Sequence, residues 1–94
     1  MIQSFSDERA ENLMRGQRVV ELVNIEDQAR TRLIRLDSAT SLEDLRALRG
    51  NRLEALAGSR KGQFSIRISD QYRICFKWKA AKKGPTDVEI TDYH

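Results

Sequence analysis

The sequence predicts an α+β domain in which two N-terminal helices pack on one face of a small, twisted, mainly antiparallel sheet. Before Gly50 the apolar residues recur every three or four positions, which is typical of helices with one buried side. After Gly50 they recur at every second position, which is typical of strands with one buried face. Helices followed by strands favour an α+β arrangement. Because the chain has 94 residues, we expect a single domain, residues 1–94, with a small core.

The first half contains two predicted helices and one further helical turn. Ser6 can cap a helix whose first turn carries two acidic residues, and Gly16 ends it. A second, longer helix begins near Asn24, and a turn from Ser41 through Leu45 follows it. Residues 19–23 are apolar but too short a run to assign. The apolar stripe of the long helix consists of Ile25, Ala29, Leu33 and Leu36.

Three alternating runs in the second half predict an antiparallel meander. They cover residues 63–69, residues 72–79 and the region around Val88 and Ile90. A short turn joins the first two, and a polar loop, residues 80–86, precedes the last. Residues 52–56 are a candidate for one more strand. The residues expected on the apolar face, against the helices, are Phe64, Ile66, Ile68, Tyr72, Ile74, Phe76, Val88 and Ile90.

The opposite face of this sheet is expected to be cationic. Alternation places Arg67, Arg73 and Lys77 there and, by parity along the last strand, Tyr93. The pattern thus predicts one exposed surface that combines a phenol with several cations. Cys75 has the same parity, and we favour an inert thiol over a reactive one.

The positive charge is concentrated in one part of the chain. The net charge is +3, but residues 46–83 hold eleven lysines and arginines against two acidic residues, while both flanking segments are negative. Such a block predicts a polyanionic partner, either nucleic acid or an acidic protein. No apolar run approaches the roughly 18 residues of a membrane span. The acidic start is unlike a secretory signal, and the single cysteine excludes an internal disulfide, so we expect a reduced, cytoplasmic protein without membrane contact.

The chain's one histidine, His94, is its best candidate for proton transfer near neutral pH. By itself a terminal histidine is a poor predictor of function. The sequence has no glycine-rich phosphate loop, no serine nucleophile motif and no metal-ligand spacing. RNA cleavage fits what remains, because RNA supplies its own nucleophile, the 2′-OH. That reaction needs an acid, a base and cations, and no metal or cofactor.

At this point three runs resemble a known family. They are NRLEALAGSRKGQFSIRI (51–68), QYRICFKW (71–78) and VEITDYH (88–94). They resemble HigB-type toxins, the plasmid maintenance killer branch of the RelE/ParE superfamily. Residues 1–5 and 39–46 also fit, and residues 15–26 and 80–86 fit most loosely.

The resemblance implies a RelE-like microbial-RNase fold and metal-independent mRNA cleavage in the decoding site of the ribosome, which inhibits translation. It also implies a helix-turn-helix antitoxin of the HigA type as partner. The catalytic ending would be Asp92, Tyr93 and His94, with His94 as general acid or base. Arg73 matches a basic position near the scissile phosphate and is expected to be catalytic as well. The expected RNA-binding residues are Arg60, which matches a basic loop position, together with Lys61, Arg67 and Lys77.

One departure from the family leaves alternatives open. Family members often carry lysine where this chain has Ala57, and some have histidine where Glu54 stands. Lys61, Arg60 or Arg67 would then supply the charge, or the chain is a catalytically weak ribosome- or RNA-binding module. A second alternative is a non-catalytic inhibitor of DNA gyrase of the ParE type, although such chains typically lack the Asp-Tyr-His ending.

Overall fold

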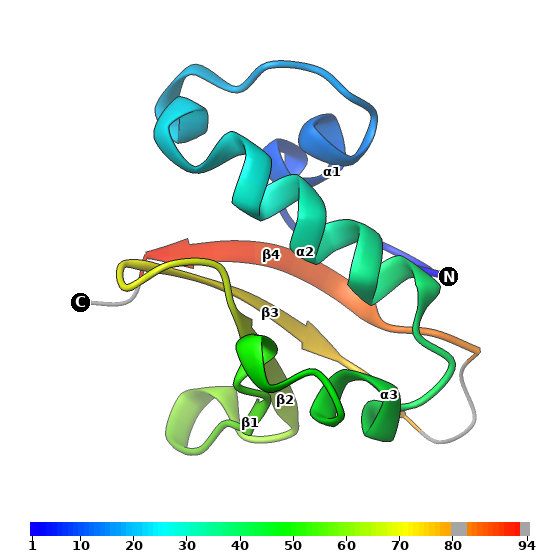
Figure 1. Ribbon diagram of the computed structural model, residues 1–94. Helices are drawn as coiled ribbons and strands as arrows, with labels where there is room; N and C mark the ends of the chain where they lie inside the picture. Colours follow the sequence, from blue (N-terminus) through cyan, green and yellow to red (C-terminus); the bar gives the residue numbers. More distant parts are fainter. Residues whose placement is uncertain (80–82, 93–94) are drawn as a thin grey trace.

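The computed structural model describes residues 1–79 and 83–92, and in it helices cover one face of a four-stranded antiparallel sheet (Figure 1). This confirms the predicted α+β class. The strand order is β1-β2-β3-β4, so each strand pairs with the next along the chain. The elements, with η for 3-10 helices, are α1 (Glu8–Met14), η1 (Val20–Ile25), α2 (Glu26–Ser38), α3 (Leu42–Arg46), η2 (Arg49–Asn51), β1 (Glu54–Ala55), η3 (Gly58–Arg60), β2 (Gln63–Arg67), β3 (Tyr72–Lys77) and β4 (Thr86–Asp92).

The start of α1 differs by one residue from the prediction. Asp7, not Ser6, is the N-cap, because its Oδ1 accepts the backbone N–H of Arg9 at 3.0 Å. The Ser6 hydroxyl instead donates to the carbonyl of Asp87, 3.1 Å away on β4. Residues 19–23, which the pattern left unassigned, lie mostly in η1, and η1 runs directly into α2.

The short helix α3 forms where it was expected. The Ser41 hydroxyl accepts the backbone N–H of Asp44 at 3.3 Å and caps the helix. The Asp44 carboxylate in turn accepts the hydroxyl and the backbone N–H of Thr40, at 2.7 and 2.8 Å. These hydrogen bonds lower the pKa of Asp44 below its usual value, and the bond from the Thr40 hydroxyl has the largest effect.

The core lies between α1, α2 and the apolar face of the sheet. Leu33 and Leu36 of α2 are completely buried, as are Ile66 and Ile74 of the two central strands. Their burial confirms the predicted helix stripe and the strand alternation. Phe64 and Tyr72 are only half-buried and pack against the margin of this core.

A parallel contact between the N-terminal segment and β4 was not predicted. The bridge joins Phe5 to Val88, and the backbone N–H of Val88 donates to the carbonyl of Ser4 at 3.1 Å. This pairing covers the edge of β4, which would otherwise expose its backbone groups. Gly84 lies under the same segment, and a Cβ at this position would lie 1.9 Å from the carbonyl oxygen of Met1.

β2 and β3 are slightly shorter than the sequence pattern indicated, whereas β4 begins at Thr86, which was expected in the loop. β3 ends at Lys77, so residues 78 and 79 follow the strand, and residues 80–82 of the expected loop lie outside the described residues. Within the ranges 1–79 and 83–92, no helix is long and apolar enough to cross a membrane.

Candidate functional site

The sheet side opposite α2 carries the charged and polar residues of the strands. Register places Arg67 beside Arg73 and Arg73 beside Thr91, so one row crosses β2, β3 and β4. A second row joins Ser65, Cys75 and Glu89. We call this side, together with Arg60 of η3, the polar face. Its strand members are Gln63, Ser65, Arg67, Arg73, Cys75, Lys77, Glu89 and Thr91.

Arg73 lies inside the polar face rather than on its surface, so the prediction that it is exposed was wrong. Only 7% of the residue is exposed. Its Nε donates to the Ser65 hydroxyl at 2.7 Å, and its guanidinium donates to the carbonyl of Arg52 at 2.6 Å. Arg52 has a left-handed backbone conformation (φ 45°), which lets the segment before β1 lie across Arg73. Parity along β3 was predicted correctly, but this covering segment could not be read from the alternation.

Cys75 is completely buried between Ser65 and Glu89, although alternation placed it on the outward side. A thiol without access to solvent is a poor nucleophile and a poor metal ligand. The burial therefore favours the inert thiol over the reactive one. Among the described residues, no group of three or more histidine, cysteine or acidic side chains is placed to hold a metal ion.

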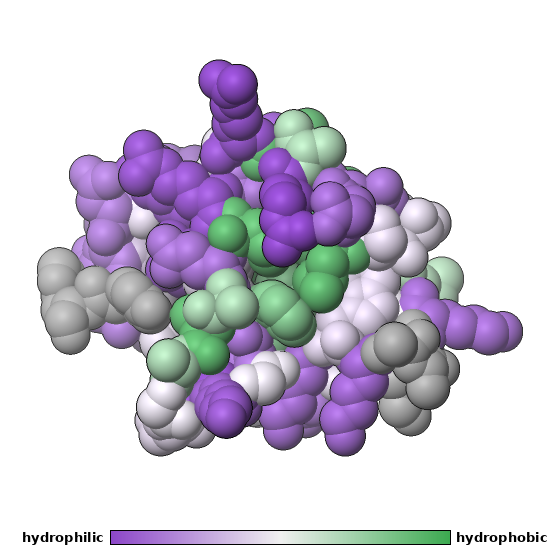
Figure 2. Space-filling model, turned by 90° about the horizontal axis from the view of Figure 1, so that it is seen from below, coloured by the Kyte–Doolittle hydropathy of each residue, from purple (hydrophilic) through white to green (hydrophobic). Residues whose placement is uncertain are grey.

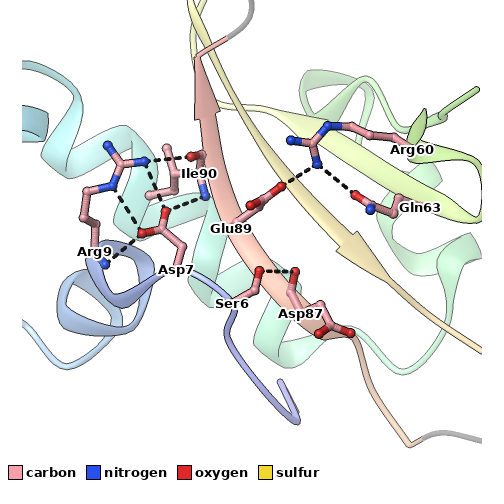
Figure 3. A network of polar contacts seen from close by, with 8 residues as sticks. All are labelled: Ser6, Asp7, Arg9, Arg60, Gln63, Asp87, Glu89 and Ile90. Carbon is pink, nitrogen blue, oxygen red and sulfur yellow. Dashed lines mark hydrogen bonds and ion pairs between the residues drawn. The ribbon is translucent and has the colours of Figure 1, made fainter. Parts of the chain in front are cut away.

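Arg60 is held over the polar face by two acceptors. It donates to the Gln63 side chain at 3.0 Å and forms an ion pair with Glu89 (Figure 3). The Arg60 side chain nevertheless keeps 35% of its surface accessible. The pair fastens η3 to β4 and places a reachable cation beside that strand. Lys61, directly after it, is exposed.

The other two predicted RNA-binding residues lie further apart. Arg67 is half-buried and pairs with the exposed Asp70. Lys77 is exposed but lies opposite Thr86, at the beginning of β4, whereas Asp92 is at its end. Six residues of strand separate these two positions, or about 20 Å. Arg73 therefore lies opposite the C-terminal part of β4 and Lys77 opposite its start, while Arg60 bonds to Glu89 and Gln63 between these two positions.

The end of β4 is held from both sides. The Asp7 carboxylate accepts the backbone N–H of Ile90 at 3.0 Å, and the Arg9 guanidinium donates to the Ile90 carbonyl at 3.0 Å (Figure 3). The hydrogen bond from Arg9 to Asp7 raises the pKa of that guanidinium. On the other side, the Gln71 amide donates to the Asp92 carboxylate at 3.0 Å. Tyr93 and His94, the predicted catalytic end, follow directly but lie outside the described residues.

Sequence reasoning missed four supporting residues. Asp7 and Arg9 were assigned only to a helix, although they bind β4. Ser65 binds Arg73 and Glu89 pairs with Arg60, although alternation indicates only that these two residues point to the outward side of their strands. A serine and a glutamate in outward positions beside a strongly basic block were the signal that could have found the last two.

A family model matches the chain over most of its length, and a known protein matches part of it. The family model described as RelE-like toxin of type II toxin-antitoxin system HigB matches residues 4–94. Toxin HigB-1 of Vibrio cholerae serotype O1 is 46% identical over 55 residues. That alignment covers 58% of this chain and 58% of the Vibrio protein, so it spans little more than half of either. Because the family model covers nearly the whole sequence, the chain belongs to the HigB family of RelE-like toxins.

Proposed function

We propose that this chain is a metal-independent endoribonuclease that cleaves mRNA on the ribosome and is neutralised by a helix-turn-helix antitoxin. One observation supports the proposal: Arg60 pairs with Glu89 of the strand that ends at Asp92, just before Tyr93 and His94 in the sequence, and Arg73 lies opposite Thr91 of the same strand. A polyanionic substrate bound there would meet positive charge on the strand that immediately precedes the chain's one histidine in the sequence. Membership of a toxin family supports the same reading.

The proposed reaction uses the nucleophile that RNA carries. A base removes the proton of the 2′-OH while its oxygen attacks the adjacent phosphorus. The bond from phosphorus to the 5′-oxygen breaks, and an acid protonates that oxygen. The products are a 2′,3′-cyclic phosphate and a 5′-hydroxyl. His94 would serve as one of these proton-transfer groups, and Asp92 and Tyr93 would position it or share the transfer.

The proposed role of each cation depends on how exposed its side chain is. Arg60 and Lys61 are accessible and would contact the scissile phosphate, where negative charge builds up in the transition state. Arg73 is held by Ser65 and by the segment at Arg52, and it would act as a positioning residue that also contributes positive potential. Arg67 and Lys77 would bind phosphates on either side.

The test of the reaction is His94→Gln in a translation extract with defined mRNA. Loss of a proton-transfer group typically lowers the rate by about 10²- to 10⁴-fold, so cleavage should nearly stop. Cosedimentation with ribosomes should persist, because glutamine leaves the cations in place. Unchanged cleavage by the variant, or gyrase inhibition with intact mRNA after expression of the natural chain, would contradict the proposal.

A gain-of-function variant tests whether positive charge near Arg60 speeds the proposed cleavage. Ala57 is exposed at the start of η3, three residues before Arg60. Ala57→Lys adds a cation at the position where family members often carry one, and we expect about tenfold faster cleavage. Ala55→Lys, which adds the same charge on exposed β1, is the control. An equal increase from both variants would show that net charge alone, not position, sets the rate.

A further inference from the structure

A groove lies between the C-terminal half of α2 and the short helix α3. It has a volume of about 270 Å³. Two large apolar side chains that line it are exposed, Ile34 by 52% and Leu48 by 45%. Exposed apolar side chains that gather around a groove mark an interaction surface more often than isolated ones do. The lining residues are Ile34, Arg35, Ser38, Ala39, Asp44, Leu45 and Leu48.

The side of the molecule that carries α3 also has apolar surface. Figure 1 shows α3 on the lower side of the molecule, away from α1. Figure 2 views that lower side, and hydrophobic residues gather near its centre with hydrophilic residues around them. An apolar centre with a polar border is the usual composition of a protein-binding surface.

One side of the groove carries a group of arginines. Arg35 lines the groove and donates to the side chain of buried Asn51 at 3.4 Å, and Arg32 lies one turn earlier on α2. The Arg32 guanidinium donates to the carbonyl of Arg67 at 3.1 Å. Partial burial lowers the pKa of Arg32, and the positive charges of Arg35 and Arg67 add to this effect. Carboxylates that bind here would relieve this repulsion.

The opposite side of the groove offers much less charge to a ligand. The Asp44 carboxylate lies there, but it already accepts two hydrogen bonds from Thr40. The groove is thus apolar in the middle and cationic on one side. This combination fits an amphipathic segment with an apolar side chain for the groove and acidic residues for the arginines.

We infer that this groove is the docking site for an acidic, amphipathic segment of the antitoxin. The inference depends on the proposed function only for the existence of an antitoxin. An RNA backbone has phosphates for Arg32 and Arg35 but nothing to cover Ile34 and Leu48. A second copy of the chain would bring the same arginines toward each other, which is unfavourable.

The position of the groove affects how a bound antitoxin would inhibit the toxin. Neither α2 nor α3 carries a predicted catalytic or RNA-binding residue, so the occupant need not touch the polar face. An antitoxin held by this groove would then act through its bulk, by preventing entry into the ribosome. Purified complex should still lack cleavage activity on ribosomes while its polar face stays accessible to small anions.

The experiment measures antitoxin affinity of the full chain carrying Ile34→Glu and Leu48→Glu together. Both side chains are about half exposed, so the fold should persist. The probe is the antitoxin that copurifies with the natural toxin from its own operon, separated and titrated back. We expect the Kd to rise by about 100-fold or more, since apolar anchors at the centre of an interface carry much of the affinity. In cells, the variant should stay toxic while the antitoxin no longer rescues growth.

The matched control is Val20→Glu with Val23→Glu on η1. These two side chains are also apolar and exposed, by 77% and 43%, but they lie outside the groove. The control should bind the antitoxin as the natural chain does. A second groove variant, Ser38→Arg, fills the same space from the last turn of α2, where a cation is tolerated. It replaces the double variant if circular dichroism shows that the latter is unfolded.

Three results would overturn the inference. The first is natural affinity in a folded groove variant. The second is loss of ribosome cosedimentation with antitoxin affinity retained, which would assign the groove to RNA. The third is a change in the sedimentation of the toxin alone with antitoxin affinity retained, which would assign it to a second copy. The binding measurement involves no RNA, so its outcome is independent of whether His94 is catalytic.

Discussion

Replacing Ser65 by alanine tests whether the buried polar pair under the candidate site stabilises the fold. The variant removes the hydroxyl that accepts the Arg73 Nε–H at 2.7 Å, and Ser65 itself is completely buried. A hydrogen bond to a charged group contributes about 1.5 to 3 kcal/mol, and a guanidinium N–H left without its acceptor accounts for much of that loss. We therefore expect the free energy of unfolding to fall by about 2 kcal/mol. For a domain of this size the melting temperature should fall by roughly 10 °C.

A double-mutant cycle isolates the interaction from the separate effects of each change. Urea unfolding is measured for Ser65→Ala, for Arg73→Met and for the two together. If the side chains interact as the geometry indicates, the double variant should lose about 1.5 to 3 kcal/mol less than the sum of the single losses. Ser59→Ala, at an exposed position of η3, is the control and should change stability by no more than about 0.5 kcal/mol. Single losses that add to within about 0.5 kcal/mol would refute the reasoning.

Three further predictions concern charge, acid stability and a close contact. Glu89→Gln should tighten ribosome binding, because Arg60 keeps its charge and loses a carboxylate that competes with phosphate. The slope of the logarithm of the binding constant against the logarithm of the salt concentration should become steeper by about one. Cosedimentation with ribosomes at several salt concentrations measures this slope, and an unchanged slope would count against the prediction. Since bonds from Thr40 lower the pKa of Asp44 in the folded state, their stabilisation is present above the usual value of 3.8 and is lost as the pH falls below it. The natural chain and Asp44→Asn should therefore converge in stability as the pH falls through the lowered pKa of Asp44, which urea unfolding from about pH 6 down to about pH 2 measures. Gly84→Ala should destabilise the chain by about 1 to 3 kcal/mol, because the new Cβ overlaps the N-terminal backbone, and a natural melting temperature would contradict this.

The helices and the sheet could be predicted because their signals are local. Leu33 and Leu36 follow the helix period, and Ile66 and Ile74 follow the strand period. The period within each element is enough to predict its buried face, even when the element that packs against it is unknown. The helix cap was placed one residue too early because Ser6 and its neighbour are both good caps, and only the position of β4 decides between them.

The candidate site could be predicted in composition but not in exposure. Alternation assigned Arg73 to the correct face, yet its burial depends on the segment at Arg52, more than twenty positions earlier in the chain. That segment crosses the polar face because the backbone of Arg52 is in the left-handed conformation. Glycine or asparagine in a sequence often predicts this conformation, whereas arginine does not. A non-local contact made through an atypical residue leaves no periodic signal.

Several of the contacts that sequence patterns missed involve one element, β4. Along its outer edge the strand is bound by the N-terminal segment at Val88 and by Asp7 at Ile90. On its inner edge it pairs with β3, and Arg60 holds the intervening Glu89. Proton transfer to RNA requires reacting groups held to within a fraction of an ångström, which a frayed chain end does not provide. The strand is fixed on both edges as far as Asp92, so the N-terminal helix would contribute to the proposed chemistry although it carries none of the proposed reacting groups.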